Sequence, residues 1–253
     1  MAGSPDNAFK TRLRNRVPLV GTLLTLPSPE IAEVCAAAGF DWLFVDMEHG
    51  LLDIGDVQRM IQAAGLCPCI VRVPMNEAIW IAKALDTGAA GVIVPHINTV
   101  ADARLAVRGG KFPPIGTRSI GVARAQGYGT RVQESVDRAN DQVVMIPQVE
   151  HIDGARHIDE IVAVAGVDAA FIGPFDLSAS LDKPGQIGDA EVAAAIRTIR
   201  DGCAVAGVAS GIFVVDAGSA RQAFSEGFSL VCIATDTLLL ARVAADVVRM
   251  SRP

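Results

Sequence analysis

Short runs of apolar and β-branched residues recur along the whole chain, separated by longer amphipathic stretches. Runs such as LFVD, VIVP, AAFIG and VCIA have the nearly continuous apolar character of strands that are buried on both faces. Such strands belong to parallel sheets, which need long connections, usually helical, between consecutive strands. We therefore expect eight strands, at 19–25, 42–46, 69–73, 91–95, 143–149, 169–173, 211–214 and 230–234.

Helical patterns fill the intervals between these runs. Ser28, Pro29 and Glu30 provide a cap, a first-turn proline and an early acid for a helix that extends to Ala38. Further helices are expected at 53–64, 77–87, 100–108, 154–164, 191–206, 218–226 and 237–250. Eight strand–helix units in 253 residues predict an α/β fold, a single (β/α)8 TIM barrel domain that spans 1–253.

A doubly wound sheet is the alternative arrangement of the same elements. Dinucleotide-binding sheets of that kind carry Gly-x-Gly-x-x-Gly after the first strand. No such motif follows the first apolar run, so this alternative lacks its main support.

Composition narrows the class of protein. No apolar run reaches the ~20 residues that span a bilayer, and the polar start of the chain lacks the apolar stretch of a secretory signal. The five cysteines, an odd number, indicate reduced thiols, so we expect a soluble cytoplasmic protein with no membrane partner. A net charge of −6 and an aromatic content of 5% weigh against nucleic acid as a partner. Cys67 and Cys69 lack a second Cys or His pair nearby, and we interpret them as strand-edge thiols rather than zinc ligands.

One segment, 109–137, departs from the alternation of strands and helices. It is rich in glycine and arginine and contains two adjacent prolines. A connection this long inside a compact domain is more often functional than incidental. The alternative is a surface loop whose arginines are simply solvated.

Polar and pocket-forming residues occupy the positions where the strands are expected to end. In a (β/α)8 barrel the catalytic residues lie at these carboxyl ends, so we expect the side chains to surround one site. The residues concerned are Asp46, Glu48, His49, Arg72, His96, Gln148, Glu150, Gly173, Pro174, Phe175, Asp176 and Phe213.

Glu150 and Asp176 follow neighbouring strands and form the central pair of this set. Adjacent strands lie ~4.8 Å apart, so two carboxylates at their ends can meet one cation. Carboxylates without a thiol or imidazole cluster suit a hard ion such as Mg²⁺ or Mn²⁺. The alternative is that either acid caps the following helix, as Asp176 before Leu177 could do.

Asp46, His49 and Arg72 are the candidates for acid–base and charge-stabilising roles. A carboxylate three residues before a histidine can orient the imidazole and raise its basicity, as a general base requires. Arg72 ends the apolar run CIVRVP, where its planar fork suits a carboxylate or a developing oxyanion. The alternatives are a structural histidine and an internal salt bridge.

Lysines provide a useful negative observation. The chain contains Lys10, Lys83, Lys111 and Lys183, and none falls in an expected strand or at its carboxyl end. Enzymes that form a Schiff base with a carbonyl substrate need such a lysine, so any enolate chemistry at this site would need a metal instead. The loops after the last two strands lack a glycine-rich phosphate nest, and we expect no sugar phosphate.

Five motifs in order resemble the class II pyruvate aldolases of the 4-hydroxy-2-oxoheptanedioate and 2-keto-3-deoxy-sugar-acid type, within the citrate lyase superfamily. The resemblance covers almost the whole chain. It is carried by AGFDWLFVDMEHG (38–50), VRVP (71–74), PPIGTRSIGVARA (113–125), PQVE (147–150) and FIGPFDLSASL (171–181).

This resemblance implies a function and a role for each matching residue. It implies reversible cleavage of 4-hydroxy-2-oxo acids to pyruvate, or hydroxypyruvate, and an aldehyde, with a divalent cation: Mg²⁺ or Mn²⁺, with Co²⁺ or Zn²⁺ as alternatives. Glu150 and Asp176 would hold the cation, and His49 with Asp46 would form the acid/base dyad. Arg72 would stabilise the enolate. The substrate-binding residues would be Gln148, Gly173, Pro174, Phe175 and Phe213.

The resemblance also implies a homohexamer, a trimer of dimers, whose C-terminal helix is exchanged with a neighbouring subunit. Phe175 and Phe213 depart from the alanine and leucine of many relatives, so the usual acceptor aldehyde does not follow. His96 stands where an uncharged residue is expected; we expect it to support the site residues, and direct contact with the substrate is the alternative. Two other functions stay open: a lyase acting on coenzyme A thioesters, and a non-catalytic barrel that binds 2-oxo acids.

Overall fold

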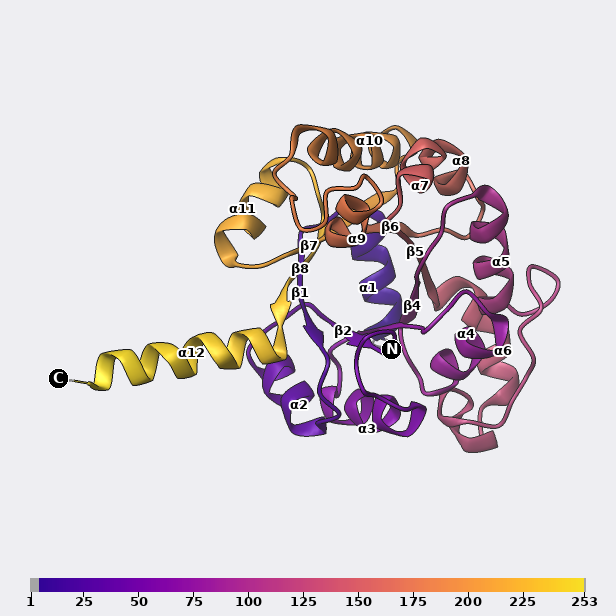
Figure 1. The fold of residues 1–253 in the computed structure, drawn as a ribbon. Helices are drawn as coiled ribbons and strands as arrows, with labels where there is room; N and C mark the ends of the chain where they lie inside the picture. Colours follow the sequence, from indigo (N-terminus) through magenta and orange to yellow (C-terminus); the bar gives the residue numbers. More distant parts are fainter. Residues whose placement is uncertain (1–4, 253) are drawn as a thin grey trace.

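The computed structural model describes residues 5–252 and shows a closed barrel of eight parallel strands arranged in chain order (Figure 1). The expected barrel is therefore confirmed; residues 1–4 and 253 of the expected domain lie outside the described residues. The strands are β1 (Leu19–Leu24), β2 (Trp42–Asp46), β3 (Cys69–Arg72), β4 (Gly91–Val94), β5 (Val144–Val149), β6 (Ala169–Ile172), β7 (Ala209–Val214) and β8 (Leu230–Thr235).

Helices surround the barrel, and those expected from the sequence are found within a few residues, except that the helix expected at 154–164 consists of two short ones, α7 and α8. The helices are α1 (Pro5–Arg14), α2 (Pro29–Ala37), α3 (Ile54–Ala64), α4 (Ala78–Asp86), α5 (Val100–Gly110), η1 (Arg124–Gly129), α6 (Val132–Gln142), α7 (Ile152–Arg156), α8 (Ile158–Val162), α9 (Pro174–Ala179), α10 (Ala190–Ala206), α11 (Ala217–Ser225) and α12 (Asp236–Ser251).

The interior of the barrel is filled by large side chains and closed at one end by α1. Trp42, Phe44 and Phe171 pack with ring centroids 5.5–6.3 Å apart. Gly21 faces Trp42, and a Cβ there would lie 2.4 Å from the indole ring, so only glycine admits this packing. Phe9 of α1 is buried in the same cluster. The opposite end of the barrel, at the carboxyl ends of the strands, therefore stays open for an active site.

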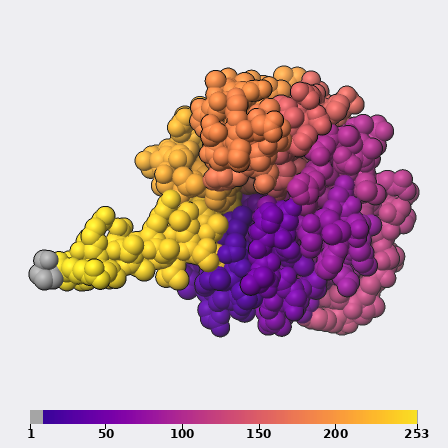
Figure 2. Space-filling view, in the orientation of Figure 1, coloured from indigo at the N-terminus to yellow at the C-terminus, as the bar shows by residue number. Residues whose placement is uncertain are grey.

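Helix α12 stands away from the body of the molecule (Figures 1 and 2). Of its sixteen residues only Asp236 is buried, and apolar side chains along it are exposed. These include Leu240, Val243 and Val247. None of the described helices has the length and apolar character needed to cross a membrane.

The glycine- and arginine-rich segment packs against α4 rather than over the strand ends. The Arg118 guanidinium is buried, 2.6 Å from an Asp86 oxygen and stacked over the Phe112 ring. Arg124 donates a hydrogen bond to the Thr87 carbonyl at 2.9 Å. None of the described residues of this segment lines the cavity at the carboxyl ends of the strands.

Candidate active site

The register between β2 and β3 places an acid and an arginine side by side at the carboxyl end of the barrel. Asp46 and Arg72 are direct register partners. Arg72 donates to both Asp46 carboxylate oxygens, at 2.8 and 2.7 Å, and both residues are buried. This bidentate pair is the internal salt bridge that the sequence left as an alternative role for Arg72. It fixes the guanidinium, whose remaining nitrogen lies 3.2 Å from Glu48.

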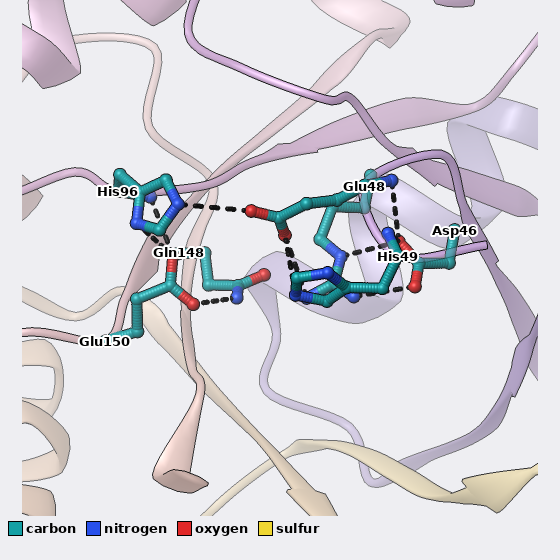
Figure 3. A network of polar contacts seen from close by, with 7 residues as sticks. Asp46, Glu48, His49, His96, Gln148 and Glu150 are labelled. Atoms are coloured by element: carbon teal, nitrogen blue, oxygen red, sulfur yellow. Dashed lines mark hydrogen bonds and ion pairs between the residues drawn. The ribbon is translucent and has the colours of Figure 1, made fainter. Parts of the chain in front are cut away.

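Glu48, His96 and Glu150 converge beside this pair (Figure 3). The His96 ring lies between the two carboxylates, with Nε2 3.2 Å from Glu48 and Nδ1 3.1 Å from Glu150. The His96 backbone N–H also donates to Glu150 at 2.8 Å. One ligand atom from each of the three residues lies within 4.8 Å of the others. The cluster therefore joins the ends of β2, β4 and β5.

Local backbone features allow this convergence. His96 has φ +56°, a left-handed conformation that is uncommon for a residue with a side chain and that marks strain at functional sites. Gly173, just after β6, lies against Glu150, and a Cβ there would be 2.9 Å from the carboxylate. Glycine at 173 therefore leaves room for the Glu150 side chain, which also accepts a short hydrogen bond from Gln148.

The excess of negative charge at this end, and its buried oxygens that lack a hydrogen bond, fit a divalent cation. Three acids, Asp46, Glu48 and Glu150, face a single arginine, Arg72, so the negative charge exceeds the positive charge beside it. Glu48 Oε2 and Gln148 Oε1 are buried and accept no hydrogen bond among the described residues. Burial raises the pKa of Glu48, and the charge of Glu150 raises it further while that of Arg72 opposes the change. Excess buried acceptors of this kind need a cation or a donor ligand.

His49 does not pair with Asp46 through its ring, as the expected dyad would require. The Asp46 carboxylate instead accepts the backbone N–H of Glu48 at 3.0 Å and that of His49 at 3.4 Å. The His49 ring is largely exposed, and its Nε2 lies 3.9 Å from Glu48. The described contact of the ring is therefore with Glu48, because Arg72 and the backbone already occupy Asp46.

Asp176 lies in the first turn of the short helix α9 and is exposed. Its carboxylate has no hydrogen-bond or ion-pair partner among the residues that the structure describes. It does not act as the cap of α9, whose N-cap is Gly173. It also lies outside the Glu48–His96–Glu150 cluster, although it lines the same cavity. The carboxylate is therefore free to meet a ligand from the side of β6.

A cavity of about 300 Å³ opens at this end of the barrel. Of the ten residues that the sequence predicts as catalytic, metal-binding or substrate-binding, Glu150 is buried and does not line the cavity. The other nine line it: Asp46, His49, Arg72, Gln148, Gly173, Pro174, Phe175, Asp176 and Phe213. Phe44 and Phe171 also line it, and the sequence signal for them is only their place in buried strands. Glu48 and His96 were in the polar strand-end set, but the sequence assigned no ligand role to either.

The polar side chains thus come from several strand ends and meet at one cavity, with fewer partners than their charges require. This arrangement defines the molecule as an enzyme of the (β/α)8 barrel class. Comparison with known proteins gives the family. Residues 20–242 match the sequence pattern of the HpcH/HpaI aldolase/citrate lyase family, and the chain belongs to this family.

Relatives and solved structures agree with this assignment. The chain is 38% identical over 255 residues to a hydroxypyruvate/pyruvate aldolase of Paraburkholderia phytofirmans, covering 97% of this chain and 98% of the relative. It is 37% identical over 243 residues to a 4-hydroxy-2-oxo-heptane-1,7-dioate aldolase of Klebsiella pneumoniae, covering 94% and 91%. A crystal structure of an aldolase/citrate lyase family protein from Burkholderia cenocepacia has a TM-score of 0.94 at 38% identity, covering 98% and 100%.

Proposed function

We propose that the chain is a divalent-metal-dependent aldehyde-lyase. It reversibly cleaves 4-hydroxy-2-oxo acids to pyruvate, or hydroxypyruvate, and an aldehyde. The observation that carries the proposal is the group of buried acceptors around Glu150, unbalanced by cations, at the carboxyl end of a barrel of the aldolase family. The aldolase names of relatives at 37–38% identity support it over the alternative of a coenzyme A thioester lyase.

Glu150 and Asp176 are proposed to hold the cation, with Glu48 and His96 beside Glu150. The donor set is mostly carboxylate and amide oxygen, which suits Mg²⁺ or Mn²⁺. The imidazole of His96 would also suit Co²⁺ or Zn²⁺. When bound, the cation would polarise the keto carbonyl of the 2-oxo acid and so stabilise the enolate.

The residues of the chain would carry the remaining steps. In the cleavage direction His49 takes the proton of the C4 hydroxyl, the C3–C4 bond breaks, and its electron pair moves into the enolate of the 2-oxo acid. Arg72 donates to the enolate oxygen, where charge builds during the reaction. Transfer of the proton held by His49 to C3, directly or through solvent, then gives pyruvate or hydroxypyruvate and restores His49. Asp46 orients Arg72 through the bidentate pair, and Glu48 lies closest to the His49 ring.

Exchange of the pyruvate methyl protons in D₂O tests this proposal, because exchange needs the enolate but no aldehyde. Protein treated with a strong chelator should lose exchange and cleavage, and Mg²⁺ or Mn²⁺ should restore both. NMR follows the exchange, and an aldehyde-coupled assay follows the cleavage. Undiminished rates in rigorously metal-free protein would refute the metal-dependent mechanism.

We propose that α12 mediates assembly, in keeping with the expected hexamer. Leu240, Val243 and Val247 form an exposed apolar stripe at helical spacing. Val243→Asp should reduce the mass measured by light scattering, whereas Ala245→Asp, on the opposite face of α12, should not. A full-size Val243→Asp assembly would exclude this interface. A cytoplasmic location is likewise proposed, and the odd number of cysteines supports it.

A further inference from the structure

The cavity changes character between its buried wall and its exposed rim. The charged groups Asp46 and Arg72 lie at the buried wall. The rim is aromatic: Phe175 is 46% exposed, and its ring centroid lies 6.4 Å from that of Phe213, at an angle of 56°. Leu23 and Phe171 continue the apolar surface inward. A molecule that reaches beyond the 2-oxo acid site therefore meets ring surfaces.

Positive charge is scarce around this rim. Arg72 is the one Lys or Arg that lines the cavity among the residues whose side chains the structure describes. Its guanidinium already contacts Asp46 and Glu48. An acceptor that carried a carboxylate would find no unpaired Lys or Arg among the described residues of the lining, and it would lose water against the two rings, which is unfavourable.

We propose that the acceptor subsite takes neutral apolar or aromatic aldehydes, with Phe175 and Phe213 as its walls, and discriminates against aldehydes that carry a carboxylate. This inference rests on the proposed aldolase function and names its second substrate class. It separates the chain from the relative named for a seven-carbon dioate, whose cleavage to pyruvate leaves a four-carbon aldehyde with a carboxylate.

Two physical terms set the expected size of this preference. Rings in contact favour one another beyond the area that they bury, and an apolar pocket discriminates about 10-fold for one well-packed group. Removing a carboxylate from water without a partner adds a cost in the same direction. We therefore expect at least a 10-fold preference, in kcat/KM, for a neutral aldehyde over its anionic analogue.

A matched pair of acceptors tests the preference directly. The aldehydes 4-oxobutanoate and its methyl ester have the same chain and differ in charge; benzaldehyde adds an aromatic probe. Pyruvate addition to each is measured with metal-loaded protein and divided by the methyl proton exchange rate of the same preparation. The normalised kcat/KM for the ester and for benzaldehyde should exceed that for 4-oxobutanoate by at least about 10-fold. Equal rates, or faster reaction of the acid, would overturn the inference while leaving the aldolase function standing. Absence of exchange would overturn both.

Variants show whether the rings cause the preference. Phe175→Ala and Phe213→Ala should each lower the ester-to-acid ratio several-fold, because the ester loses its apolar contact and the acid does not. Tyr128→Ala is the matched control, since Tyr128 is an exposed aromatic residue in η1 that does not line the cavity. Thermal unfolding verifies that each variant is folded. A ratio that stays at the wild-type value in both phenylalanine variants would assign the preference elsewhere and refute the role of the two rings.

Discussion

Two clusters of buried charge lie at opposite ends of the barrel, and their charges are balanced differently. At the amino end, Lys10 lies 3.1 Å from Asp168 and donates to the Val143 carbonyl at 2.8 Å. Arg14 pairs with the second Asp168 oxygen, and Lys111 donates to the carbonyls of Asn140 and Val143. At the carboxyl end, Glu48 and Gln148 keep buried oxygens that accept no hydrogen bond from the described residues.

The difference indicates what each cluster does. Burying a charge is costly unless it is paired and hydrogen-bonded. At the amino end protein groups alone pair Asp168 with Lys10 and Arg14 and hydrogen-bond Lys111. The carboxyl-end cluster meets this condition only in part, so a cation and substrate would complete it. The first cluster should therefore affect stability, and the second should affect catalysis. Substitutions at the two ends can separate these effects.

The largest effect is expected from Glu150→Gln. The amide keeps the shape of the side chain but removes the charge that is proposed to hold the cation. We expect kcat/KM for cleavage to fall by about 10³-fold, a loss of the size seen when an electrostatic stabiliser is removed. Titration of the metal-free protein with Mn²⁺ should show weakened binding. Glu160→Gln, an acid on α8 outside the cavity, is the control; a Glu150→Gln enzyme within 10-fold of wild type would place the cation elsewhere.

Asp168→Asn should have the opposite profile. It leaves the buried Lys10 without its counter-charge, and breaking a buried pair costs about 3 kcal/mol or more of unfolding free energy. Because Asp168 precedes β6 at the amino end, kcat/KM of the folded variant should stay within about two-fold of wild type. Urea unfolding and steady-state kinetics measure the two quantities. Lost activity with unchanged stability would contradict the division between the two ends.

A pH effect should distinguish the amino-end cluster further. Burial, together with the charge of Lys10, lowers the pKa of Lys111 to about 7 from its usual 10.5. Between these pH values the unfolded chain binds a proton that the folded chain does not, so stability should rise with pH. The unfolding free energy, taken relative to that of Lys111→Met, should increase by up to about 1.4 kcal/mol per pH unit between pH 7 and 10. Below pH 7 it should not change, because Lys111 is protonated in both the folded and the unfolded chain. A flat difference from pH 7 to 10 would show that Lys111 keeps its proton in the folded state.

The sequence predicts the barrel and the residues around its cavity well because both depend on local patterns. Each strand is a short apolar run, and each polar set follows directly in the chain. Helix α1 was missed because Phe9 and Leu13 are isolated apolar residues in a polar stretch, and their burial depends on the barrel that they close. Helix α9 has only six residues, too few for a periodic pattern, and it begins at Pro174 directly after β6.

The contacts inside the site follow from tertiary geometry that no local pattern shows. Asp46 was expected to orient His49, but the register with β3 gives its carboxylate to Arg72. Similarly, His96 contacts Glu48 and Glu150 from a left-handed backbone conformation after β4. Spacing along the chain can predict which residues share an end of the barrel. It cannot predict which of them pair.

The smallest expected effect tests whether the backbone at His96 is strained for the sake of the site. A left-handed conformation costs a residue with a Cβ about 1 kcal/mol relative to glycine. His96→Gly should therefore unfold about 1 kcal/mol less readily than His96→Ala, because both lose the ring and only alanine retains the strain. Both should bind Mn²⁺ more weakly than wild type and to the same extent, since the imidazole beside Glu150 is absent in each. Wild-type Mn²⁺ affinity in His96→Gly would show that the strained backbone, and not loss of the imidazole, weakens binding in His96→Ala. Equal unfolding free energies of the two variants would show that the backbone at position 96 is not strained. The expected outcome instead means that the chain tolerates a strained turn in order to place an imidazole between two acids.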